Sequence, residues 1–236
     1  MATIAEKLQQ VRRRLDAACH AAARPVDSVT LVAVSKTFGA EQVRDASDAG
    51  QRLFGENYVQ EALAKIESVA DLAGCIEWHF IGPLQSNKAR AVAENFAWVH
   101  SVDRLSIAQR LSQHRPAHMP PLQICLQVNI SDETSKSGLA APDVASAIDE
   151  VARLPGLRLR GLMAVPRESA IEAEQREPFA RLRRLLEEAN ARGASLDTLS
   201  MGMSADLEAA VAEGSTMVRI GSAIFGARSR TPGITA

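Results

Sequence analysis

Eight short apolar segments recur along this chain of 236 residues, and a longer amphipathic stretch follows most of them. We expect strands at 29–35, 52–56, 77–82, 97–101, 122–130, 158–164, 198–201 and 217–221. The main helical patterns lie at 57–72, 86–96, 102–114, 141–154, 168–193 and 204–214. Alternating strands and helices predict parallel strands joined by right-handed crossovers. Eight such units in a chain of this length predict one closed (β/α)8 barrel of the TIM type.

An open, doubly wound sheet is the alternative, but the glycine-rich turn of dinucleotide-binding proteins is missing after the first strand. No linker or shift in composition divides the chain, so we expect one domain over residues 1–236. An apolar stripe at every third or fourth position predicts an extra N-terminal helix within residues 1–24. Residues 229–236 are expected to form a flexible tail.

Charge and hydropathy narrow the range of partners. A net charge of -1 and a pI near 6.5 do not provide the basic surface that nucleic acid binding requires. No stretch is apolar for long enough to span a bilayer, and the N-terminal stretch lacks the apolar run of a secretory signal. The three cysteines are widely spaced, which predicts neither disulfides nor a metal site. We therefore expect a cytoplasmic protein with no nucleic-acid or membrane partner. Because no second domain demands assembly, we expect it to be a monomer.

Polar residues stand where the predicted strands end. Lys36 follows the first strand, Asn57 follows the second, His79 lies in the third and Arg219 lies in the eighth. In a barrel of this type, functional side chains gather at the C-terminal ends of the strands. A single polar residue there can simply be exposed to solvent, without a functional role. His79 lies between two aromatic residues, and a hydrogen-bonded histidine in the core explains it equally well.

Two glycine-containing loops follow the last two strands. The segment "SMGMS" carries the hydroxyls of Ser200 and Ser204, and "GSAIFG" places Gly221 and Ser222 at the start of a short helix. The loops after strands seven and eight of such barrels frequently bind phosphate, and the amide groups that begin a helix attract anions. Tight-turn geometry alone is the alternative explanation for the glycines.

Lys36 is one of only five lysines among 27 basic residues. It could be a surface cation, a salt-bridge partner or a nucleophilic amine. Desolvation and neighbouring cations would lower the pKa of its ammonium group and expose the lone pair that attacks an aldehyde. A ligand with both an aldehyde and a phosphate would satisfy Lys36 and the two loops together, and pyridoxal 5′-phosphate is the common one. Lys7 and Lys65, in contrast, are expected on exposed polar helix faces.

Five segments carry a family likeness: "LVAVSKTFGAEQVRDA", "LFGENYVQEALAK", "WHFIGPLQSNKAR", "VNISDETSKSG" and "LSMGMSADLEAAVAEGSTMVRIGSAIFGAR". Through them, nearly the whole chain resembles the pyridoxal phosphate homeostasis protein family, whose barrel is similar to the N-terminal half of alanine racemase. The resemblance implies that Lys36 holds pyridoxal phosphate as an internal aldimine, that Arg219 faces the pyridine nitrogen and that Asn57 lies near the ring. The residues expected around the phosphate are Ser200, Ser204, Gly221 and Ser222, and Met201 is expected among the other cofactor-binding residues. Possible accessory residues are His79 and Lys136, the latter near the mouth.

One departure from the family pattern follows Lys36, where the family commonly has Thr-Lys-Pro and this chain has Thr37, Phe38 and Gly39. A second lysine in this loop is therefore not expected to take part.

The expected function is binding rather than catalysis. An arginine beside the pyridine nitrogen cannot accept its proton, which makes the ring a weak electron sink. The chain also ends soon after the eighth strand, without the second domain that gives a racemase its opposing acid or base. We expect a protein that holds and buffers intracellular pyridoxal phosphate, with apo-enzymes as candidate recipients. A weak fold-type III racemase or lyase is the alternative, and a Schiff-base aldolase is the third hypothesis.

Overall fold

The computed structural model describes residues 2–131, 133 and 136–226, and its eight strands close into one barrel in chain order. The strands are β1 (Thr30–Val34), β2 (Leu53–Glu56), β3 (Glu77–Phe80), β4 (Trp98–Val102), β5 (Leu122–Gln127), β6 (Leu157–Met163), β7 (Thr198–Ser200) and β8 (Met217–Ile220). Neighbouring strands pair in parallel, and β1 closes the barrel on β8 from Thr30 opposite Met217 to Ala33 opposite Ile220. The predicted (β/α)8 barrel is confirmed.

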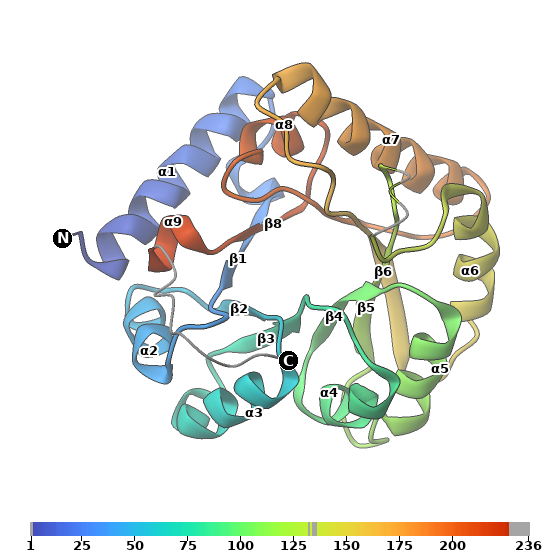
Figure 1. The fold of residues 1–236 in the computed structure, drawn as a ribbon, viewed down its shortest axis with the longest axis horizontal. Helices are drawn as coiled ribbons and strands as arrows, with labels where there is room; N and C mark the ends of the chain where they lie inside the picture. Colours follow the sequence, from blue (N-terminus) through green and yellow to red (C-terminus); the bar gives the residue numbers. More distant parts are fainter. Residues whose placement is uncertain (1, 132, 134–135, 227–236) are drawn as a thin grey trace.

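Helices surround the barrel in a ring (Figure 1). They are α1 (Ile4–Ala21), α2 (Ala40–Asp48), α3 (Val59–Ser68), α4 (Ala89–Asn95), α5 (Leu105–His114), α6 (Val144–Val151), α7 (Glu172–Ala191), α8 (Leu207–Ala212) and α9 (Ser222–Phe225). Single turns of 3-10 helix lie at Val26–Ser28, Ala70–Leu72, Ser86–Lys88 and Ala141–Asp143. Phe54, Phe80 and Leu162 are fully buried in the main apolar core with residues of these helices. Within the described chain, no helix has the length and apolarity needed to cross a bilayer.

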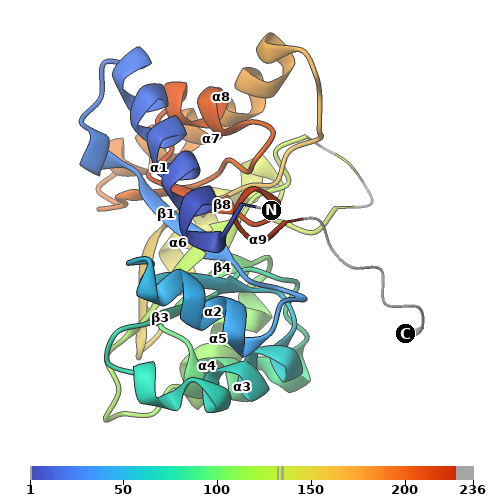
Figure 2. The ribbon, with the colours of Figure 1, turned by 90° about the vertical axis from the view of Figure 1, so that its left-hand side faces the viewer.

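The extra N-terminal helix that the sequence predicts is α1. Thr3 and Glu6 form a capping box at its start, and Leu8, Val11 and Leu15 bury one of its faces. The helix packs against α8 and α9 along the side of the barrel where β8 meets β1 (Figures 1 and 2). It therefore supports the segments that follow β7 and β8. The predicted tail at 229–236 lies outside the described residues.

The interior of the barrel is partly polar, whereas bulky branched side chains usually fill this space. Trp98, Cys125 and Met163 form a small apolar cluster there. Four buried polar side chains accompany it, and their hydrogen bonds connect β3 and β4 to β7 and β8 across the barrel. These residues are His79, His100, Ser200 and Arg219.

Candidate functional site

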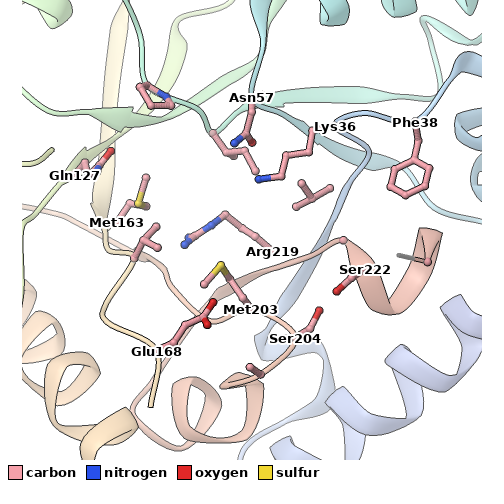
Figure 3. Close-up of a pocket in the computed structure, with 17 residues that line it drawn as sticks. Lys36, Phe38, Asn57, Gln127, Met163, Glu168, Met203, Ser204, Arg219 and Ser222 are labelled. Carbon is pink, nitrogen blue, oxygen red and sulfur yellow. The ribbon is translucent and has the colours of Figure 1, made fainter. Parts of the chain in front are cut away.

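A cavity of about 450 Å³ opens at the C-terminal ends of the strands (Figure 3). Its volume is in the range of small-molecule sites. The loops and strand ends that form it come from both halves of the chain. The described residues that line it are Val34, Lys36, Phe38, Asn57, Ile81, Pro83, Gln127, Met163, Val165, Glu168, Met203, Ser204, Ala205, Arg219, Gly221, Ser222 and Gly226.

Lys36 points into this cavity from the end of β1 (Figure 3). Because successive residues of a strand face opposite sides, the preceding Ser35 turns outward, and its hydroxyl donates to Glu56 Oε1 at 2.6 Å. Lys65 Nζ, on α3, donates to the Ser35 carbonyl oxygen at 2.8 Å and to Glu56 Oε1 at 2.5 Å. The backbone that carries Lys36 is thus fixed by a buried ion pair. The prediction that Lys65 is exposed is wrong, since its side chain is only 3% exposed.

The loop after Lys36 has an unusual backbone. Thr37 has φ of 67°, in the left-handed region that non-glycine residues seldom adopt, and its amide donates to Glu61 Oε1 at 2.6 Å. Phe38 lines the cavity, and its ring packs on Phe225 of α9 with ring centroids 5.2 Å apart. Phe38 therefore links the Lys36 loop to α9.

Asn57 follows β2 and faces the cavity beside Lys36 (Figure 3). Its backbone packs so closely on Gly82 that a Cβ at residue 82 would lie 2.2 Å from the Asn57 carbonyl oxygen. Asn57 Oδ1 is buried, with no hydrogen-bond partner among the described residues. A buried polar atom without a partner costs free energy, so this oxygen is suited to accept a hydrogen bond from a ligand.

The two predicted anion-binding loops supply Ser204, Gly221 and Ser222 to the cavity. Figure 3 shows the hydroxyls of Ser204 and Ser222 on the α9 side of the cavity. Arg14 of α1 donates to the Ser204 carbonyl oxygen at 2.7 Å, which ties this loop to the N-terminal helix. Gly202 has φ of 98°, and a Cβ there would lie 2.6 Å from that of Ala210. Close packing of this loop on α8 thus requires glycine.

Arg219 extends from β8 into the cavity (Figure 3), and oxygen atoms of two residues hold its guanidinium group. Its Nη1 donates to the carbonyl oxygen and to the hydroxyl of Ser200, both at 2.6 Å, and its Nη2 donates to the Ala164 carbonyl oxygen at 2.9 Å. Burial lowers the pKa of the Arg219 guanidinium to about 10. The group remains a cation at neutral pH.

Four residues named from the sequence are not among the described residues that line the cavity. Ser200 faces the barrel interior, where its hydroxyl binds Arg219 and His100. Met201 is fully buried in the main apolar core. Neither side chain therefore lines the cavity, as the expected contacts with the cofactor would require. His79 is a hydrogen-bonded core histidine, as its alternative interpretation had it. Lys136 pairs with Glu133 and donates to the carbonyl oxygen of Val165, a lining residue.

Sequence reasoning missed several lining residues, among them Gln127, Met163, Met203 and Glu168. Gln127 and Met163 are the last residues of β5 and β6. The predicted strands ran on to residues 130 and 164, which hid these ends. Successive side chains of a strand point to opposite faces, so correct strand ends would have predicted that both side chains point toward the barrel axis.

Known proteins similar to this chain identify its family. The model of the alanine racemase N-terminal domain matches residues 7–229. A pyridoxal phosphate homeostasis protein of Pseudomonas aeruginosa is 59% identical over 97% of both chains. Its counterpart from Escherichia coli is 52% identical over 97% of this chain and 98% of the relative. The structure of PipY from Synechococcus elongatus with pyridoxal phosphate bound has 39% identity and a TM-score of 0.83, covering 95% of this chain and 100% of PipY. This chain therefore belongs to the pyridoxal phosphate homeostasis protein family.

Proposed function

We propose that this protein binds pyridoxal 5′-phosphate in the cavity at the C-terminal end of its barrel and serves the homeostasis of this cofactor. The observation that carries the proposal is one shared cavity, lined by the amine of Lys36 and by the hydroxyls of Ser204 and Ser222. PipY, which is 39% identical and was solved with pyridoxal phosphate bound, supports binding of this cofactor.

The lining residues fit the parts of this cofactor. It supplies an aldehyde that condenses with an amine, a pyridine ring and a phosphate. Lys36 would hold the aldehyde carbon, Ser204 and Ser222 would bind the phosphate, and Arg219 would donate to the ring nitrogen. The buried Asn57 Oδ1, which has no partner among the described residues, would accept a hydrogen bond from the ring hydroxyl. Every part of the cofactor thus meets a side chain of suitable chemistry.

Arg219 favours binding over catalysis. Enzymes that use this cofactor as a strong electron sink place a carboxylate beside the ring nitrogen, whereas a guanidinium disfavours a protonated ring. Among the described lining residues, the groups other than Arg219 that could act as an acid or a base are Lys36 and Glu168. The two similar proteins from bacteria are named homeostasis proteins rather than enzymes. A weak amino-acid racemase is the second candidate function, because the barrel is that of alanine racemase.

The proposal also covers domain organisation, localisation, oligomeric state and the recipients of the cofactor. We expect residues 1–236 to form a single domain that acts as a cytoplasmic monomer. Because the cofactor would be held by a lysine amine and an anion site rather than buried permanently, apo-enzymes could receive it from this protein.

Borohydride reduction tests the assignment of Lys36. The purified protein with added pyridoxal phosphate should absorb in the visible range, lose that colour on reduction, and carry one added pyridoxyl phosphate group on the peptide that contains Lys36. Lys36→Ala should abolish this modification, while Lys88→Ala, which lies outside the cavity lining, should retain it. Modification of a different lysine in the wild-type protein would contradict the proposal.

A turnover assay separates binding from catalysis. With L- or D-alanine or serine, the loaded protein should interconvert enantiomers no faster than free pyridoxal phosphate does. Turnover well above that rate would show that the protein is a racemase and would contradict a function limited to binding.

A further inference from the structure

A continuous chain of hydrogen bonds crosses the barrel interior from Arg219 to Glu77. Arg219 Nη1 lies 2.6 Å from Ser200 Oγ, which lies 2.6 Å from His100 Nδ1. His100 Nε2 lies 2.8 Å from His79 Nδ1, and His79 Nε2 lies 3.0 Å from Glu77 Oε1. The chain begins at the cavity that holds Lys36 and ends in a hollow of about 890 Å³ lined by Glu77 and Trp98.

The two ends of this chain fix its direction. A guanidinium can only donate hydrogen bonds, and an ionised carboxylate can only accept them. Glu77 therefore takes the Nε2 hydrogen of His79, and a neutral His79 is left with Nδ1 as an acceptor. His100 then donates from Nε2 to His79 Nδ1, and its Nδ1 accepts the hydrogen of the Ser200 hydroxyl, which itself accepts from Arg219. Neutral histidines in this chain of hydrogen bonds therefore have the same tautomer, with the hydrogen on Nε2.

The surroundings of the two histidines keep them neutral. Both rings are fully buried, and His79 stacks on Trp98 with centroids 5.5 Å apart. Burial is the main cause that lowers the pKa of each histidine. His79 and Arg219 lower the pKa of His100 further, whereas Glu77 opposes the shift of His79. The hydrogen bond from His79 is the main cause that lowers the pKa of Glu77, and Arg160 of β6, which lies over the Trp98 ring, lowers it further. A proton on either ring would reverse one hydrogen bond and place a second cation near Arg219.

We propose that Ser200, His100, His79 and Glu77 are positioning residues that hold Arg219 in the orientation needed to bind the ring of the ligand. The inference rests on the proposed function. Ser200 and Ala164 accept three hydrogens of the guanidinium, and within the described residues its Nε–H and second Nη2–H remain available to the cavity. The fixed tautomers keep Ser200 Oγ an acceptor toward Arg219. The chain thus links the N-terminal end of the barrel to the ligand site.

Nuclear magnetic resonance of the protein without added cofactor tests the direction of the chain. In a long-range proton–nitrogen correlation spectrum of protein labelled with nitrogen-15 histidine, His79 and His100 should both show the neutral Nε2–H form at pH 7.5. Glu77→Gln retains an acceptor and should leave this pattern unchanged, whereas Glu77→Leu should release the Nδ1–H form of His79. Because Glu77 is 44% exposed, both variants are expected to fold. Charged rings, or a pattern unchanged by Glu77→Leu, would overturn the inference whatever the protein binds.

Ligand binding tests the effect on Arg219. His100→Leu should weaken the binding of pyridoxal phosphate about tenfold, the loss expected when one hydrogen bond to a charged group is misaligned, and should shift the absorption maximum of the bound cofactor. His100→Gln, which can both accept and donate, should restore most of the affinity, and His118→Leu on the surface is the control. If His100→Leu does not fold, Ser200→Ala, which removes only the hydroxyl, takes its place with the same expected loss. Unchanged affinity and spectrum in folded variants would refute the positioning role but leave the proposed function intact, whereas an absence of binding by the wild-type protein would refute both.

Discussion

At the scale of single residues, the buried charges of Glu56 and Lys65 hold the backbone at Lys36. Both side chains are almost fully buried, and burial raises the pKa of Glu56 while Lys65 and Ser35 oppose that shift. Removing one member of a buried pair leaves the other charge without compensation and typically costs about 3–5 kcal/mol. Lys65→Met should therefore lower the free energy of unfolding by about that amount, measured by urea denaturation at pH 7.5.

A matched pair of variants isolates the cause. Lys65→Met combined with Glu56→Gln should recover most of the lost stability, because the uncompensated carboxylate is gone. Lys88→Met, which removes a lysine that is not buried, should change stability little. A Lys65→Met protein as stable as the wild type would show that the ion pair does not support the fold.

The misassignment of Lys65 has a physical explanation. In sequence, polar neighbours on a helix indicate exposure, and Lys65 has such neighbours in α3. Its partner Glu56 is turned toward α3 by the alternation of β2, and that direction depends on where the strand begins and on its register in the barrel. Lys36 itself was predicted correctly to face the cavity, because its position after a strand of a closed barrel does not depend on a distant pairing.

At the scale of elements, α1 stabilises the loop after β7. Arg14 donates to the Ser204 carbonyl oxygen and forms an ion pair with Glu208 of α8. We expect Arg14→Ala to weaken pyridoxal phosphate binding several-fold by loosening the Ser204 loop, with little change in the affinity of Arg13→Ala, whose side chain is exposed. Equilibrium dialysis of the two variants measures this difference, and equal affinities would show that the loop needs no support from α1.

The elements were predicted well in number and poorly at their ends. All eight strands exist, yet the strand expected at 122–130 ends at Gln127 and the helix expected at 204–214 spans Leu207–Ala212. A periodic pattern of apolar residues indicates which side chains are buried. Buried loops can extend this pattern beyond the last hydrogen bond of a strand or the last turn of a helix, so the predicted elements are too long. At the site, the strand expected at 198–201 ends at Ser200, whose hydroxyl faces the barrel interior, and Met201 enters the core, so neither side chain lines the cavity.

At the scale of the whole molecule, the buried histidines make stability depend on pH. The pKa of His79 and that of His100 are lowered in the folded protein from the ordinary value of 6.5. As the pH falls below that value, the unfolded chain binds protons that the folded protein does not, so stability is lost. The slope approaches about 1.4 kcal/mol per pH unit for each histidine that takes up a proton only on unfolding.

Urea denaturation at several pH values between 7.5 and 5.5 tests this dependence. The free energy of unfolding should decline steadily below about pH 6.5, and His100→Gln should show a smaller decline because one of the two groups is gone. A flat profile in the wild-type protein would mean that the two histidines take up protons over the same pH range in the folded and the unfolded states. That result would also contradict the fixed direction of the hydrogen-bond chain.

The account as a whole depends on Lys36 and the serine hydroxyls contacting one ligand at the same time. A crystal structure of the protein with pyridoxal 5′-phosphate measures this directly. We predict continuous electron density from Lys36 Nζ through the pyridine ring beside Arg219 to a phosphate between Ser204 and Ser222. Density that joins the cofactor to another lysine, or a phosphate bound away from these two serines, would contradict the central claim.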